Sequence, residues 1–492
     1  LFAIDFGNLV SVVTTLRASP GLPLAAIADA GWVNYHWLYF ALPAGLVDFC
    51  GVRIPAFHAL ILTNLLMAML LVQTLMTLIA TRFPRSERTA QWTVAIVLFA
   101  PFTGYYYQIA ASRLSLGWFA MPARNHLVLS PLNSMIVFGN NTFALVLALF
   151  AAMMLERWNS ERRLGDIVMG TFALSMVTGY SVTLLVPLVI ALILWLLLGR
   201  IERPVIALTA ALVIGGAVAA MFMVIHVLGG GGARHVAVAF DGGQFLRIVI
   251  LGMLPLWTLA VIGGRTRLTF FHVLIAAAIA VPSVLYVAGS PTGQVDVSMK
   301  TGSLLAIAFA PLVAFAIDRW LRGEFGRVQT FVAALLIVLG LVQTSVYVLQ
   351  FPYYRITNSR ARSVALPLDY YDALAWIRDH TPPQSIVADP GGLTFRDEYP
   401  TLWIAERRGW LSTPYTEPYL APQHADISRR AAIWADFIRD PAGTSASSIA
   451  SSVDYLMIPR AIQSPLWIPV SRTGSWWIYQ SVRTRSAQTS AG

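Results

Sequence analysis

The sequence alternates between long apolar runs and short polar segments over its first 350 residues. An α-helix of about 20 apolar residues is long enough to cross a hydrocarbon core about 30 Å thick. The runs that reach or approach this length lie at approximately 54–80, 91–111, 134–155, 167–179, 181–199, 205–227, 247–263, 269–288, 303–318 and 328–350. They predict an all-α polytopic membrane domain at 1–350, with about ten spans and a first outer loop at 1–53.

The pattern changes after residue 350. Residues 351–492 contain 14 arginines and 12 of the 24 acidic residues, with frequent proline, serine and tryptophan. The stretch DYYDALAWIRDHTPP (369–383) has the pattern of an amphipathic helix that is ended by prolines. Strands are indicated by SIVADPGG (385–392), VDYLMIPR (453–460) and GSWWIYQS (474–481). These segments predict a small α/β domain at 351–492 that ends in a disordered polar tail near 484–492.

The composition excludes an ordinary soluble protein. Of the 492 residues, 57% are hydrophobic and 12% are charged, whereas soluble domains carry roughly 25% charged residues. Cys50 is the single cysteine, so the chain forms no intrachain disulfide and no cysteine-based metal site. Because the chain starts at Leu1, without a methionine or a complete apolar run before Asp5, we expect one more helix upstream.

The distribution of arginine predicts the topology. Five alternate loops between the apolar runs carry thirteen basic residues, whereas the loops 112–133, 228–246 and 289–302 carry four. Basic residues favour the cytoplasmic side of a membrane. The arginine-rich loops are therefore expected inside, and the first outer loop and the C-terminal domain are expected to be extracytoplasmic. The formal net charge of +10 is explained by these loops, without a nucleic-acid partner.

The stretch NYHWLYFALPA (34–44) is apolar and aromatic, but we do not expect it to span the membrane. The apolar segment 33–49 has only 17 residues and is interrupted by Pro43 and Asp48. An additional span would also place the preceding residues on the cytoplasmic side. We therefore predict a helix lying at the membrane surface, with its aromatic residues at the depth of the headgroups.

Few carboxylates are available for chemistry on the outer face. In the membrane part only Asp5, Asp29, Asp48, Asp241 and Asp296 face outward in the predicted topology. Asp5 follows an apolar stretch at the membrane boundary, where partial desolvation tunes a carboxyl group for proton transfer; the alternative is a helix cap. The other acids of this part lie among cytoplasmic arginines and are interpreted as solvated loop charges: Glu87, Glu156, Glu161, Asp166, Glu202, Asp318 and Glu324.

Cations that could bind a phosphate group are also predicted on the outer face. Arg113, Arg124 and His126 lie in the loop 112–133, His36 lies in the surface helix, and Lys300 lies in the loop 289–302. Arginine binds phosphate oxygens through paired hydrogen bonds, although contact with lipid headgroups would explain the same residues. The sequence contains no HExxH motif and indicates no certain cofactor; a divalent metal held by Asp5 and a second carboxylate is an alternative.

The order of these features resembles bacterial membrane glycosyltransferases of the GT-C superfamily, in the protein O-mannosyltransferase and aminoarabinose-transferase group. The resemblance is carried by Asp5, by YHWLYF and VRIPAFHALILTNLL, and by ALAWIRDHTPPQSIVAD, VDYLMIP and WWIYQS in the C-terminal domain. It implies a polyprenyl-phosphate-linked sugar as donor and transfer to a glycan, lipid or protein acceptor outside the bacterial inner membrane. It also implies that Asp5 acts as general base or metal ligand. Many members have an Asp-Glu pair at this position, whereas Phe6 follows Asp5 here.

Two other classes of protein fit the composition. A transporter or flippase of lipid-linked glycans would carry polar groups at mid-membrane and often an internal repeat; the predicted spans are almost free of charge, and no repeat is found. A membrane assembly protein would act through a partner of its C-terminal domain. Loss of residues 351–492 would then abolish the whole function.

Overall fold

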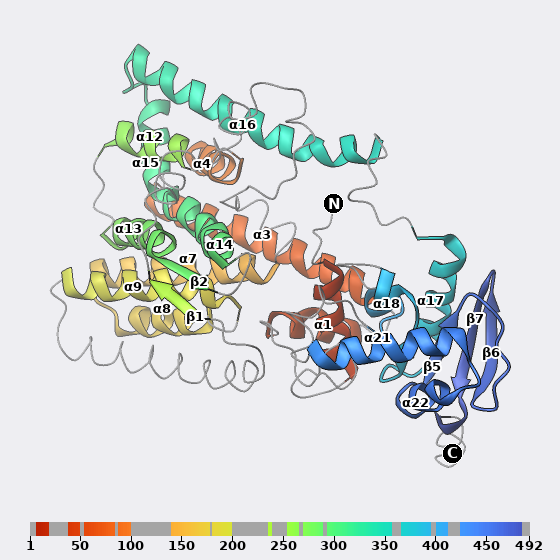
Figure 1. The fold of residues 1–492 in the computed structure, drawn as a ribbon. Coiled ribbons are helices and arrows are strands. Elements are labelled where there is room, and N and C mark those ends of the chain that lie inside the picture. Colours follow the sequence, from red (N-terminus) through yellow and green to blue (C-terminus); the bar gives the residue numbers. More distant parts are fainter. Residues whose placement is uncertain are drawn as a thin grey trace. The chain divides into compact units, whose positions relative to one another are not determined.

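The computed structural model describes residues 6–18, 38–49, 54–83, 87–99, 139–177, 180–198, 235–238, 253–264, 269–288, 293–356, 366–394, 400–411 and 424–484. These residues belong to two compact units, shown in Figure 1. The first unit contains the described residues of 1–63 and 364–492, and the second contains those of 64–222 and 233–363. The fold is mostly helical, with a small mixed sheet near the C-terminus.

Apolar helices make up most of the second unit. They are α3 (Ala56–Arg82), which begins in the first unit, α4 (Glu87–Phe99), α7 (Gly139–Glu161), α8 (Leu164–Val177), α9 (Val182–Leu198), α12 (Leu254–Gly263), α13 (Thr269–Val284), α14 (Gly293–Ala308), α15 (Ala310–Leu321) and α16 (Arg327–Ile356). A two-stranded antiparallel ladder joins β1 (His235–Val238) to β2 (Leu285–Ala288). The predicted span 205–227 lies outside the described residues.

Some of these helices have the length and surface of membrane spans. Within the described residues, Ala56–Thr81, Gly139–Trp158 and Thr301–Leu321 are long and apolar enough to cross a bilayer. Exposed apolar side chains also recur at helical spacing, as in the set Leu65, Leu66, Met69 and Leu70 of α3. A continuous apolar stripe of this kind suits contact with acyl chains better than contact with water.

The structure corrects two predicted boundaries. The segment 289–302 was expected to be a loop, but α14 starts at Gly293 and includes Lys300, and the helical path is divided at Phe309 before α15 begins. Pro311 explains the division, because it has no N–H to donate to the carbonyl four residues earlier. The predicted span 269–288 ends as a helix at Val284 and continues as β2.

The first unit begins with short helices that lie outside the sheet. They are α1 (Phe6–Ala18), the 3₁₀ turn η1 (Leu38–Phe40) and α2 (Ala41–Phe49). Pro43 and Asp48 were expected to interrupt a membrane span at 33–49, and the helix α2 contains both. Pro43 lies in the first turn of α2, where a missing N–H costs no helical hydrogen bond. Residues 34–37 of the predicted helix lie outside the described part.

The C-terminal domain is built around a five-stranded sheet. Its strand order is β4 (Arg408–Gly409), β3 (Ile386–Ala388), β5 (Tyr455–Ile458), β7 (Trp476–Ser481) and β6 (Trp467–Thr473). β4, β3 and β5 are parallel, whereas β7 pairs antiparallel with both β5 and β6. The strands predicted within 453–460 and 474–481 are confirmed as β5 and β7, and the segment 385–392, predicted as a strand and a turn, contains β3 at Ile386–Ala388 and the start of α18 at Gly391. β7 lies inside the sheet, and β6, which was not predicted, forms its edge.

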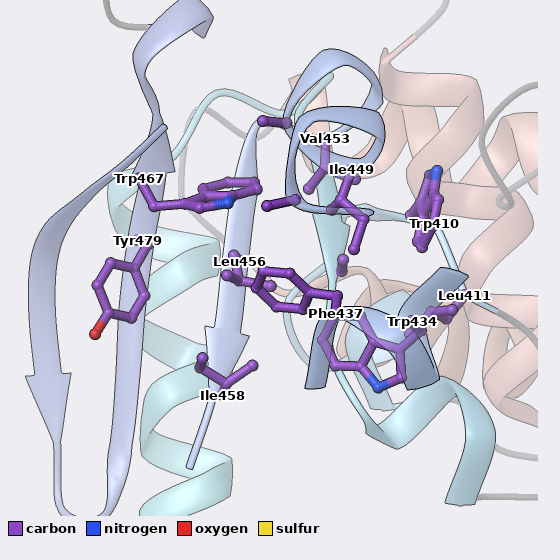
Figure 2. Packing of buried hydrophobic residues seen from close by; sticks show 13 residues of the cluster. Trp410, Leu411, Trp434, Phe437, Ile449, Val453, Leu456, Ile458, Trp467 and Tyr479 are labelled. Carbon is purple, nitrogen blue, oxygen red and sulfur yellow. The ribbon is translucent and has the colours of Figure 1, made fainter. Parts of the chain in front are cut away.

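Helices cover both faces of this sheet. On one face α17 (Leu368–His380) packs its buried residues against Met457 and Ile478. On the other face α21 (His424–Arg439) and α22 (Thr444–Ser452) pack Phe437 and Ile449 against Leu456, as Figure 2 shows. Alternate residues of β5 therefore enter opposite cores, as expected of a central strand. The remaining short helices are α18 (Gly391–Thr394) and α19 (Pro400–Trp403).

A fully buried carboxylate closes the carboxyl end of β3. Asp389 accepts hydrogen bonds from the Tyr370 hydroxyl at 2.5 Å, from Thr401 Oγ1 at 2.6 Å and from the Gly391 backbone N–H at 3.0 Å. These three donors come from α17, α19 and the start of α18. Gly391 is required here, because a Cβ at this position would lie 2.0 Å from the Tyr370 hydroxyl.

Asp389→Ala should destabilise the C-terminal domain by about 3 kcal/mol, because it leaves several buried donors without an acceptor. Asp372→Ala, which alters an exposed carboxylate on α17, should change stability by less than about 0.5 kcal/mol. Pulse proteolysis of the full-length protein in detergent, over a urea series, measures both values. Equal proteolysis midpoints for the two variants would contradict a structural role for Asp389.

Candidate functional site

Helix α1 begins at Phe6, the residue that follows Asp5. Leu9, Val10, Val12 and Val13 are all buried. The helix contacts α2 and α19, both within the first unit. α1 is therefore held by packing along its length, which fixes the point at which the chain leaves its N-terminal end.

An ion-pair network holds the C-terminal end of α1. Arg17 Nε lies 3.1 Å from Asp48 Oδ1, and Arg17 Nη1 lies 3.3 Å from Glu406 Oε2. Asp48 belongs to α2, and Glu406 lies between α19 and β4. One guanidinium thus connects three segments that are far apart in sequence. We name Arg17, Asp48, Glu406 and the backbone N–H of Ala56 the α1 junction.

Glu406 is the central group of the α1 junction. Its Oε1 accepts a hydrogen bond of 2.6 Å from the backbone N–H of Ala56, the first residue of α3. This N–H has no partner within its own helix, and a negative charge near a helix N-terminus is stabilised by the helix dipole. Glu406 also has a φ of 51°, a left-handed conformation that costs a non-glycine residue of order 1–3 kcal/mol.

The neighbouring Arg407 stabilises this backbone conformation. Its guanidinium donates to Thr381 Oγ1 at 2.8 Å, to the Arg378 carbonyl at 2.6 Å, and to the carbonyl of Glu406 itself at 3.0 Å. The contacts with Arg378 and Thr381 bind it to the C-terminal end of α17. Burial lowers the pKa of Arg407 to about 10, so it remains charged at neutral pH.

The pKa of Glu406 reflects opposing effects. Burial of the carboxyl group raises its pKa above the usual 4.5, while the hydrogen bond from Ala56 and the charge of Arg17 lower it, and the net direction is upward. A raised pKa means that the folded state binds this proton more tightly than the unfolded state does. The ionised carboxylate of Glu406 is consequently stable in this buried position only because one oxygen accepts a hydrogen bond from Ala56 and the other pairs with Arg17.

The sequence-predicted site residues are mostly outside the described part. These are Asp5, His36, Arg113, Arg124 and His126, and their roles stay predictions. The backbone of Lys300 lies in α14, and the next residue, Thr301, is fully buried. Among the described residues, no three His, Cys, Asp or Glu side chains are grouped so as to hold a metal ion.

The interpretation of Glu156 as a solvated charge was wrong. Glu156 is 3% exposed, and its Oε1 accepts a hydrogen bond of 2.7 Å from the backbone N–H of Phe270, in the first turn of α13. Asp166 is also mostly buried, with Arg157 Nε 3.5 Å from its Oδ2. Glu156 and Asp166 lie near arginines in the sequence, yet both are buried. Each has its partner on another helix, so the neighbouring arginines did not indicate exposure to solvent.

Sequence reasoning also missed a group of polar side chains in the second unit. Asn140 and Asn141, at the start of α7, and Ser181, directly before α9, are at most 2% exposed. Asn140 Nδ2 donates to the carbonyl of Tyr180 at 3.3 Å, which brings the N-terminal ends of α7 and α9 together. The pair Asn140-Asn141 at the start of an apolar run was the available signal.

Comparison with solved structures finds similarity to the oligosaccharyltransferase of Archaeoglobus fulgidus. Its apo form aligns with a TM-score of 0.49 at 12% identity. A form tethered by a disulfide bond to an acceptor peptide with the NVT sequon gives 0.44 at 11%, and a complex with an inhibitory peptide and a dolichol-phosphate gives 0.42 at 13%. Each alignment covers 92% of this chain and 65% of the archaeal chain, less than two thirds of its length. No protein-family model and no curated protein sequence matches the chain.

The raised pKa of Glu406 predicts a pH-dependent stability. The contribution of Glu406 should be complete below its unfolded pKa of 4.5 and should be lost as the pH rises through the higher folded value. Glu406→Gln keeps an acceptor for the Ala56 N–H but does not titrate. The stability of the wild type relative to this variant should therefore decrease as the pH rises above 4.5.

Unfolding midpoints of the two full-length proteins between pH 4 and 8 measure this difference. Asp372→Asn, which alters an exposed carboxylate, is the control and should show no such trend relative to the wild type. A difference that increases with pH would contradict the assigned direction of the pKa shift.

Proposed function

We propose that the chain is a membrane glycosyltransferase that transfers a sugar from a polyprenyl-phosphate donor to an extracytoplasmic glycan, lipid or protein acceptor. The observation that carries the proposal is the fixed position of α1. Asp5 immediately precedes this helix, whose far end is held by the α1 junction. A catalytic group needs such rigid support, because small displacements of a reacting group cost much of the rate.

The chemistry requires few protein groups. A sugar linked to phosphate already has a good leaving group, so the general acid that glycoside hydrolysis needs is dispensable. What remains is a base for the acceptor hydroxyl and positive charge near the departing phosphate. Asp5 is proposed as the base, and its place before a helix N-terminus favours the ionised carboxylate that this role needs.

The cations of the outer segments are proposed to bind the phosphate. They are Arg113, Arg124 and Lys300, with His36 and His126 as further donors to the substrate. Arginine suits this role because its fork of N–H groups matches two phosphate oxygens. The polyprenyl chain would lie along apolar helix surfaces such as the stripe on α3. The C-terminal domain would cover the site or bind the acceptor.

The first experiment profiles polyprenyl-phosphate sugars by mass spectrometry in a strain that lacks the protein. One lipid-linked sugar should accumulate, fall when the wild type is restored, and stay high with Asp5→Asn at equal expression. Asp29→Asn, an outer carboxylate with no proposed role, should restore the profile. Equal restoration by Asp5→Asn would remove Asp5 from the site, and an unchanged profile in the deletion strain would contradict the glycosyltransferase itself.

A second prediction concerns the support of α1. Arg17→Met should lower the rate of sugar transfer by about 10²-fold, because it releases the end of α1 and displaces the base at the other end. Binding of the donor lipid should stay unchanged, since Arg17 does not contact it in this proposal. Arg429→Met, which breaks an exposed ion pair with Asp426, is the matched control and should transfer at the wild-type rate. A loss of binding without a loss of rate would contradict a positioning role.

A further inference from the structure

Three buried polar oxygens at the N-terminal ends of α7 and α9 have no hydrogen-bond partner among the residues that the structure describes. They are Asn140 Oδ1, Asn141 Oδ1 and Ser181 Oγ, and we name them the polar cluster. Their residues are 1%, 2% and 0% exposed, so bulk water does not reach them. Buried polar groups are nearly always paired, and an unpaired one costs free energy.

A hydrogen bond and a ring contact join the two helix ends that carry the polar cluster. Asn140 Nδ2 donates to the carbonyl of Tyr180, the residue before Ser181. The rings of Phe143 and Tyr180 pack edge to face with centroids 4.7 Å apart, which fixes the same contact one helical turn further along α7. The hydrogen bond also assigns the Asn140 amide, so that its Oδ1 is the atom left to accept.

The cluster lies toward the outer ends of its helices in the predicted topology. The opposite end of α7 carries Arg157, and the arginine-rich loop that follows it is assigned to the cytoplasm. Asn140 is the second residue of the apolar segment Gly139–Trp158. The unpaired oxygens therefore lie at the side of the membrane on which the proposed transfer takes place.

The chemistry of the three atoms selects the ligand. Two are amide carbonyl oxygens, which only accept hydrogen bonds, and the third is a hydroxyl, which donates and accepts. A phosphate anion offers acceptors and would be repelled by these oxygens. A group with several hydroxyls offers donors at short spacing, which complement these acceptors.

We infer that the polar cluster is a subsite for the hydroxyl groups of the sugar carried by the lipid donor. The inference rests on the proposed function, and it separates recognition of the sugar from binding of the phosphate. Asn141 and Ser181 are the informative positions, because Asn141 Oδ1 and Ser181 Oγ have no hydrogen-bond partner in the described part of the chain that a substitution would break.

The test compares the wild type with Asn141→Leu/Ser181→Ala. Binding of a panel of polyprenyl-phosphate hexoses and pentoses, and of polyprenyl phosphate alone, is measured by native mass spectrometry on the full-length protein. The wild type should prefer at least one glycosylated lipid, and the variant should lose about tenfold of that preference. Binding of polyprenyl phosphate alone should not change.

A second measurement distinguishes a ligand site from a packing role. Without ligand, the variant should unfold at a higher temperature than the wild type, because it removes unpaired buried groups. Ser283→Ala is the control: Ser283 is equally buried, but its hydroxyl already donates to the carbonyl of Ile279 at 2.7 Å. This control should leave the lipid preference unchanged.

The outcomes separate the inference from the proposed function. If the wild type binds glycosylated and bare lipids equally, or if the variant keeps the wild-type preference, the inference is wrong while the proposed function stands. A lower unfolding temperature of the unliganded variant would assign the cluster to packing and overturn the inference as well. If the wild type binds no polyprenyl phosphate in any form, the proposed function itself fails.

Discussion

The buried carboxylate of Glu406 is the interaction on which the first unit depends. Removing a carboxylate from water costs several kcal/mol, which is offset only when its oxygens find good partners. Here one oxygen binds the first N–H of α3 and the other binds Arg17 of α1. These partners lie 350 and 389 residues away in sequence. Repositioning either helix would remove one of the partners of this buried carboxylate, so the contact helps to hold α1 and the start of α3 in place.

Sequence reasoning located the elements whose pattern is local. The apolar runs that became α3, α7 and α9, and the strands β3, β5 and β7, follow from composition and periodicity alone. α21 and α22 were not predicted. α21 is highly charged, with few apolar residues apart from those around Trp434 and Phe437, and α22 is mostly serine, a weak helix former. Both helices are stabilised by packing on the sheet, which a single sequence does not reveal.

The candidate site was less predictable, for a different reason. Acids among arginines were interpreted as solvated, yet Glu156 is buried, and Glu406, which stands before two arginines, was not considered at all. Whether a charged group is buried depends on the partners that it finds in the fold, and here the decisive partners are backbone N–H groups of distant helices. Nothing in the residues around Glu406 indicates a left-handed φ, a conformation that sequence reasoning expects at glycine or asparagine.

The two buried glutamates also provide a comparison for the polar cluster of the second unit. Glu156 and Glu406 each accept a hydrogen bond from an N-terminal N–H of another helix, so the chain satisfies buried polar groups across long sequence distances. Of the buried oxygens without a hydrogen-bond partner in the described residues, one belongs to Asp166, which has Arg157 3.5 Å away. The others are those of Asn140, Asn141 and Ser181. The indole N–H groups of Trp257, Trp403 and Trp467 are also buried without a hydrogen-bond partner among the described residues. The oxygens of Asn140, Asn141 and Ser181 differ from them in lying at two helix ends that one hydrogen bond joins, which favours a shared ligand over imperfect packing.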